Sequence, residues 1–77
     1  MEIKDIGENL RRLRRNNRLS QQELADKAGI SRIAYGQIER GEVEAKVSTL
    51  MSLAKALDVK LQDLVTKPRT LTRVRWN

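Results

Sequence analysis

Five arginines stand close together near the N-terminus, with no acidic residue among them. They are Arg11, Arg12, Arg14, Arg15 and Arg18. Guanidinium groups bind phosphate through paired N–H donors, so this cluster fits a nucleic-acid backbone. A solvated helix face is the more frequent explanation of such a run. The cluster alone is therefore weak support for a nucleic-acid partner.

The residue types that the chain lacks exclude several kinds of chemistry. Its 77 residues include no His and no Cys. Disulfides, thiol nucleophiles, Cys/His zinc sites and imidazole acid–base catalysis are thereby excluded. No paired carboxylates suggest a catalytic cleft, so we expect no enzyme, no metal and no cofactor. Because no apolar run is long enough to span a bilayer and the N-terminus lacks a signal-peptide pattern, we expect a cytoplasmic protein without membrane contact.

The net charge of +6 is unevenly distributed along the chain. A second basic group falls in the last twelve residues, which carry Lys67, Arg69, Arg73 and Arg75 and no acid. Without those four charges the rest of the chain carries only +2. A length of 77 residues allows one small domain. We assign residues 1–66 to that domain and residues 67–77 to a basic C-terminal tail or linker.

The apolar spacing and the capping residues predict five helices. The first opens at a capping box of Asp5 and Glu8 and runs to about residue 16, where Asn is expected to take the left-handed conformation that ends helices. The second helix covers residues 20–28 and the third residues 32–40. Residues 47–57 form the fourth helix, and residues 61–65 a fifth of barely one turn.

The second and third helices have strong start and stop signals. Ser20 and Glu23 form a capping box, and Gly29 supplies a stop that needs positive φ. Ser31 then caps the third helix, which Gly41 ends. Two short helices joined by a tight turn are typical of a helix-turn-helix unit. An ordinary αα-corner in a bundle fits the spacing equally well.

A longer pattern resembles one family closely. The segment IGENLRRLRRNNRLSQQELADKAGISRIAYGQIERGE, followed by STLMSLAKALDVKLQDLV, is similar to the Cro/phage-repressor-type (XRE) helix-turn-helix domain over residues 6–65. The family's fixed core positions are occupied by Leu24, Ala25, Ala28, Gly29, Ile30, Tyr35 and Ile38. The resemblance implies an all-α, five-helix bundle of the lambda-repressor-like type. It also implies a homodimeric transcriptional regulator, a repressor, that binds double-stranded DNA with residues 32–40 in the major groove.

The same resemblance assigns residues to base reading. The matching positions are Ser31, Arg32, Ile33, Gly36 and Gln37. Arg32 suits the O6 and N7 of a guanine, and Gln37 suits an adenine. Ile33 offers apolar contact to a thymine methyl, with plain packing as the alternative. Gly36 has no side chain and cannot read a base.

Phosphate contacts and one structural pair follow from the family pattern. The phosphate candidates are Ser20 and Gln21 at a helix N-terminus, with Arg11 and Arg40. Arg14 matches a position that pairs with the glutamate equivalent to Glu39 in relatives.

The chain also departs from the family pattern. Glu42 and Glu44 lie in a loop that is usually basic or neutral, Lys46 and Lys60 stand where helix caps are expected, and Tyr35 needs a hydrogen-bond partner.

The tail leaves open a second function besides transcriptional regulation. Residues 70–76 alternate like a short strand, with disorder as the alternative. The segment also weakly resembles the junction to an ImmA/IrrE-type metallopeptidase, which would place a further domain beyond Asn77. The second function is therefore a protein-interaction module, such as an antitoxin-like partner or the DNA-binding head of a larger regulator.

Overall fold

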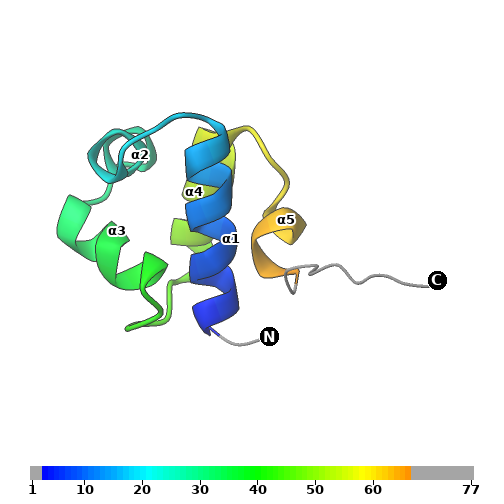
Figure 1. The fold of residues 1–77 in the computed structure, drawn as a ribbon. Helices are drawn as coiled ribbons and strands as arrows, with labels where there is room; N and C mark the ends of the chain where they lie inside the picture. Colours follow the sequence, from blue (N-terminus) through cyan, green and yellow to red (C-terminus); the bar gives the residue numbers. More distant parts are fainter. Residues whose placement is uncertain (1–2, 67–77) are drawn as a thin grey trace.

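The computed structural model describes residues 3–66, and all regular structure among them is helical (Figure 1). The helices are α1 (Ile3–Asn16), α2 (Gln21–Ala28), α3 (Arg32–Glu39), α4 (Val47–Leu57) and α5 (Leu61–Val65). Helix α1 stands in the middle with α4 behind it, while α2 and α3 lie to one side and α5 to the other (Figure 1). The predicted all-α, five-helix architecture is confirmed.

The signals around α2 and α3 act as the sequence predicts. The Ser20 hydroxyl accepts from the Glu23 N–H at 3.0 Å, and the Glu23 carboxylate accepts from the Ser20 N–H at 2.8 Å. Hydrogen bonds from the Ser20 backbone N–H and hydroxyl group to the Glu23 carboxylate lower the pKa of Glu23. Gly29 ends α2 at φ 75°, and the Ser31 hydroxyl accepts from the Ala34 N–H at 3.0 Å. The two helices are therefore joined by a tight turn with a cap on each side.

The predicted end of the first helix at about residue 16 is confirmed. Two other predicted helix ends are wrong, and so is the residue expected to take the left-handed conformation after α1. Helix α1 begins at Ile3, so Asp5 lies in its first turn, where the helix dipole also favours an acid. The left-handed residue after α1 is Arg18 at φ 57°, where the Arg18 N–H donates to the Arg15 carbonyl at 3.0 Å and the Leu19 N–H to the Arg14 carbonyl at 3.1 Å. Helix α3 ends at Glu39, with Arg40 as its C-cap.

The starts of α4 and α5 have no side-chain cap from Lys46 or Lys60. Lysine has no acceptor atom, so neither side chain can accept a hydrogen bond from the first N–H groups of its helix. At α5, the Asp63 carboxylate accepts from the Lys60 N–H at 3.0 Å instead.

The core is built from aliphatic side chains around one tyrosine. Its fully buried large side chains include Leu10, Leu24, Tyr35, Leu53 and Leu64. Asn9 is the buried polar residue of the described part, at 1% exposed. Its amide donates to the carbonyls of Leu64 and Thr66, each at 2.7 Å, and so ties the end of α5 to α1. A buried amide with satisfied donors stabilises this contact at little desolvation cost.

Gly7 brings α1 into backbone contact with the end of α3. A Cβ atom at Gly7 would lie 2.2 Å from the Glu39 carbonyl oxygen and 2.9 Å from the Ile38 carbonyl oxygen. No flexible side chain stands between the helices at this point. Only glycine permits this crossing distance.

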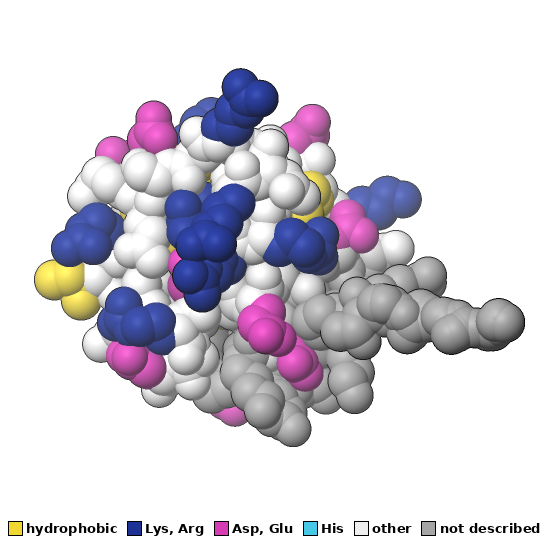
Figure 2. Space-filling view, viewed as in Figure 1, with side chains coloured by type: hydrophobic (Ala, Val, Ile, Leu, Met, Phe, Trp, Pro, Cys, Tyr) yellow, Lys and Arg dark blue, Asp and Glu magenta, His cyan; other side chains and the backbone are white. Residues whose placement is uncertain are grey.

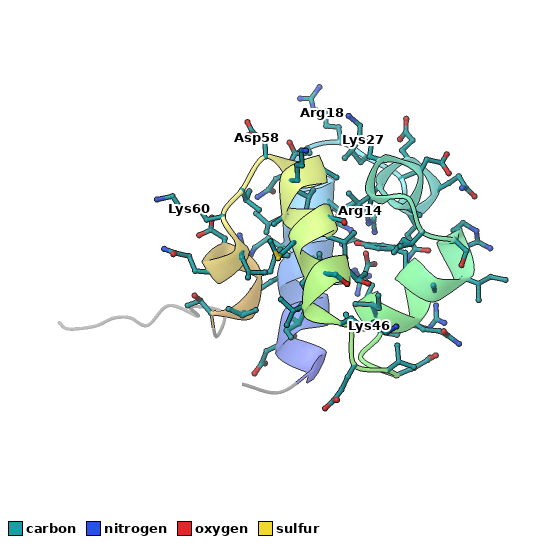
Figure 3. All side chains as sticks on the ribbon, turned by 180° about the vertical axis from the view of Figure 1, so that it is seen from behind. Arg14, Arg18, Lys27, Lys46, Asp58 and Lys60 are labelled. Carbon is teal, nitrogen blue, oxygen red and sulfur yellow. The ribbon has the colours of Figure 1, made fainter. Side chains whose placement is uncertain are left out.

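One carboxylate, together with the groups that hold it, joins three helices. Arg14 of α1 donates to Glu39 through Nε at 2.9 Å and Nη2 at 3.2 Å. Gln21 of α2 donates to the same carboxylate at 3.1 Å, and the Tyr35 hydroxyl also donates to it. We call Glu39, Arg14, Gln21 and Tyr35 the Glu39 hub. The expected contact between Arg14 and Glu39 is present, and Figure 3 shows Arg14 between α1 and the α2–α3 side of the bundle.

The hub keeps Glu39 ionised although its side chain is only 6% exposed. Burial alone raises the pKa of this carboxyl, but the hydrogen bonds from Arg14, Tyr35 and Gln21 outweigh burial and lower it. Burial and the bond to Glu39 raise the pKa of Tyr35, so its hydroxyl remains a donor.

Replacing Gly7 with Ala should destabilise the fold by about 2–3 kcal/mol, because the new methyl group forces two backbones apart. Urea unfolding followed by circular dichroism measures the change. Gly36→Ala is the matched control, since a Cβ there meets only the end of the Arg40 side chain, at 3.0 Å. Removing that helical glycine should leave stability unchanged or raise it by up to about 1 kcal/mol. Equal effects of the two substitutions would contradict the close crossing of α1 and α3.

Replacing Glu39 with Gln should destabilise the protein by about 3 kcal/mol at pH 7, because it leaves the Arg14 guanidinium, at 12% exposure, without an opposite charge. The folded pKa of Glu39 lies below its ordinary 4.5, so its stabilisation is complete above pH 4.5 and is lost as the pH falls further. The unfolding free energies of wild type and variant should therefore converge as the pH falls below 4.5. Glu44→Gln, at an exposed carboxylate, serves as the control. A difference that stays constant with pH would argue against the charged hub.

Candidate nucleic-acid interface

Helix α3 has an inner face and an outer face. Tyr35 and Ile38 are buried in the core. Arg32 and Ile33 are exposed on the other side, Ile33 at 70%, and Gln37 is half-buried beside them. The alternative that Ile33 packs inside the domain is therefore wrong. Dark blue and yellow side chains stand out at the edge of the molecule where α3 lies (Figure 2).

Ser31 stands at the start of this outer face and also caps the helix. Its oxygen accepts the Ala34 N–H at 3.0 Å. The hydroxyl proton is still available as a donor, since a hydroxyl both donates and accepts.

Ser20 and Gln21 stand at the N-terminus of α2. The first backbone N–H groups of a helix have no partner within it, and the helix dipole makes this end favourable for anions. The Ser20 hydroxyl is exposed, with its oxygen engaged in the cap. The Gln21 amide donates one bond to Glu39, so the hub fixes the side chain that was predicted to bind phosphate. An amide has two N–H donors, and the second is still available for an anion.

Arg40 does not extend freely into solvent. Its Nε donates to Glu42 at 2.7 Å, and its Nη2 donates to the other carboxylate oxygen at 3.3 Å. Its Nη1 lies 3.0 Å from the position that a Cβ on Gly36 would occupy. Both side chains are about half exposed, and the pair raises the pKa of Arg40 and lowers that of Glu42. The guanidinium therefore lies back along α3, over Gly36.

The basic cluster of the sequence divides into one part-buried arginine and four exposed ones. Arg14 faces the hub, whereas Arg11, Arg12, Arg15 and Arg18 are exposed. Figure 2 shows dark blue side chains gathered over the middle of this face, where α1 lies in Figure 1. Glu8 and Asn16, with Arg11, Arg12 and Arg15, line an open hollow of about 500 Å³ here.

Residues 3–66 contain no group of three acidic, His or Cys side chains placed to hold a metal ion. None of their helices has both the length and the apolarity needed to cross a membrane. The strand expected over residues 70–76 and the resemblance to a metallopeptidase junction fall outside the described residues.

Sequence reasoning missed the arrangement of Gly36, Arg40 and Glu42. The sequence gives Gly36 no base contact, predicts that Arg40 binds phosphate, and marks Glu42 only as an unusual acid in the loop after the third helix. The spacing held a signal, since residues four apart share one helix face and a glycine there makes room for a long side chain. Gly7 was also missed, because nothing local marks the helix that it approaches.

Comparison with known proteins agrees with this geometry. The helix-turn-helix family model HTH_3 matches residues 10–64. The control protein C.SmaI of Serratia marcescens is 44% identical over 68 residues, which cover 87% of this chain and 81% of that protein.

Solved structures give the same result. The restriction-modification controller protein C.AhdI of Aeromonas hydrophila is 35% identical, with a TM-score of 0.79 over 80% of this chain and 94% of that one. The P22 c2 repressor, in complex with a synthetic operator, is 34% identical, with a TM-score of 0.72 over 77% of this chain and 89% of that one. These relatives do not favour the protein-interaction module. The chain belongs to the helix-turn-helix family HTH_3.

Proposed function

We propose that this protein is a transcriptional regulator, a repressor, that binds specific sequences of double-stranded DNA with α3 in the major groove. The observation that carries the proposal is the division of α3 into two faces. Arg32, Ile33 and Gln37 form an accessible row outside, while the Glu39 hub holds the other side against α1 and α2. The similarity to a repressor in complex with an operator supports this assignment.

The outer face of α3 offers three kinds of base contact. The Arg32 guanidinium can donate two hydrogen bonds to a guanine, and the Gln37 amide can donate to and accept from an adenine. Ile33, at 70% exposed, suits the methyl group of a thymine. The Ser31 hydroxyl donates to a base edge at the start of the helix. Together these groups distinguish different base pairs.

Phosphate contacts position the helix in the groove without reading sequence. We assign them to the α2 N-terminus with Ser20 and Gln21, and to Arg11. Arg11 lies one turn before Arg14 and is exposed, so it is close to the side of α1 that faces α3. Because Glu39 fixes Gln21, the amide needs little reorganisation to meet an anion.

Binding rather than catalysis is the activity that we assign. The described carboxylates with lowered pKa values are Glu23, Glu39 and Glu42. Each lowered pKa has a structural cause, a helix cap for Glu23 and ion pairs for the other two. None of these groups is poised as a general acid or base.

In-vitro selection of bound duplexes from a random pool tests the function and its symmetry together. We expect an inverted repeat with half-sites about 34 Å apart, one helical turn, because a homodimer places two copies of α3 in successive major grooves. A repressor should then occupy such a repeat and lower transcription from a promoter that contains it. Failure to enrich any sequence would reject specific DNA binding.

Replacing Arg32 with Ala should weaken binding to the selected site by about 5- to 100-fold, because one two-bonded base contact is worth about 1–3 kcal/mol. Binding to random DNA should change much less. The two affinities are measured by fluorescence anisotropy at one salt concentration. Lys60→Ala removes the same charge from the start of α5, on the far side of the bundle from α3 (Figure 3), and is the control. If Arg32→Ala weakens binding to the selected site and to random DNA by the same factor, Arg32 does not read a base.

A further inference from the structure

We infer that Arg40 reads a guanine base in the major groove, across Gly36, and that Glu42 holds it in position for this contact. The inference rests on the proposed DNA binding and adds a specificity-determining residue to it. The inference also gives Gly36 a role, although glycine has no side chain that could reach a base.

The position of Gly36 on α3 is the first step. With about 3.6 residues per turn, residue 36 falls between residues 32 and 33 when the helix is viewed down its axis. Residue 40 falls in the same sector, one turn further on. Gly36 is therefore a gap in the middle of the row that Arg32, Ile33 and Gln37 form. The Arg40 side chain fills this gap, with Nη1 at 3.0 Å from the position of a Cβ on Gly36.

The hydrogen bonds of Arg40 leave one edge of the guanidinium unused. A guanidinium has five N–H donors. Nε and Nη2 each donate one bond to Glu42, at 2.7 and 3.3 Å. The remaining N–H groups belong to Nη1 and Nη2. Together these two nitrogens form the outer end of the guanidinium group. The spacing of two such donors matches the O6 and N7 acceptors of guanine.

The ion pair favours a base over a phosphate as the partner of Arg40. The Glu42 carboxylate offsets the positive charge of Arg40, which weakens its attraction to phosphate, and at the same time fixes the direction of its donors. Fixing a long side chain beforehand reduces the entropy lost when the contact forms. An acid beside the DNA also weakens binding to every sequence. The net effect is a larger difference in binding affinity between the correct DNA sequence and incorrect ones.

The test uses the DNA sequence selected by the wild-type protein, together with DNA variants in which each guanine of that sequence is replaced. For Arg40→Ala, the preference for one guanine should fall by about 5- to 100-fold. The affected base pair should differ from the one that Arg32→Ala affects. Gly36→Ala should weaken the same preference severalfold with folding intact, because its methyl group occupies the space that the guanidinium needs.

The role of Glu42 needs its own pair of variants. Glu42→Gln should lower the preference for that guanine severalfold while it strengthens binding to random DNA, because it releases Arg40 and removes a repulsive charge. Glu44→Gln is the matched control, at an exposed acid two residues further along the same loop. It should strengthen binding to random DNA and leave the preference for the guanine unchanged.

Two results would overturn the inference. If Arg40→Ala weakens binding to all sequences equally and reduces the salt slope by about one counterion, Arg40 contacts phosphate. If Glu42→Gln strengthens binding to the selected and random DNA by the same factor, Glu42 is only a repulsive charge. A wild-type protein that selects no sequence would instead reject the proposed function, at a step before any variant is compared.

Discussion

The arrangement of the helix-turn-helix unit depends on one negative charge. The Glu39 carboxylate accepts four hydrogen bonds, from side chains of α1, α2 and α3. The chain has no phenylalanine and only a small aliphatic core, so apolar packing alone constrains these short helices weakly. A carboxylate with every lone pair engaged has few alternative arrangements. The outer row of α3 is therefore held in one orientation by a polar contact on its inner side.

Two glycines shape opposite sides of α3 by the space they leave. Gly7 lets the backbone of α1 meet the Glu39 carbonyl, and Gly36 lets a guanidinium lie against the recognition helix. The first contact is between backbones and tolerates no side chain. The second is with the end of a flexible side chain, so a methyl group there displaces the guanidinium without disturbing the fold. Gly7 is thus required by the packing of two helices, whereas Gly36 makes room for the Arg40 side chain.

The sequence predicts the helices well because their signals are local. Ser20, Glu23, Gly29 and Ser31 act within one turn of their own positions, so their effects follow from neighbouring residues. The family pattern also anticipated the contact between Arg14 and Glu39. Arg18 was missed as the left-handed residue because this position is usually Gly or Asn, so an arginine gives no signal for it. The pairing of Arg40 with Glu42 depends on the path of the chain after α3, which no capping or periodicity rule describes.

The separation of the two faces of α3 also bears on how this domain can diverge. Arg32 and Ile33 are exposed and take no part in the Glu39 hub. Substitutions at such surface positions usually change stability by less than about 0.5 kcal/mol. If these residues read bases as proposed, gene duplication followed by drift at their codons can yield proteins with new recognition preferences that still fold. The inner face allows no such freedom, so sequence variation among descendants should concentrate on the outer row.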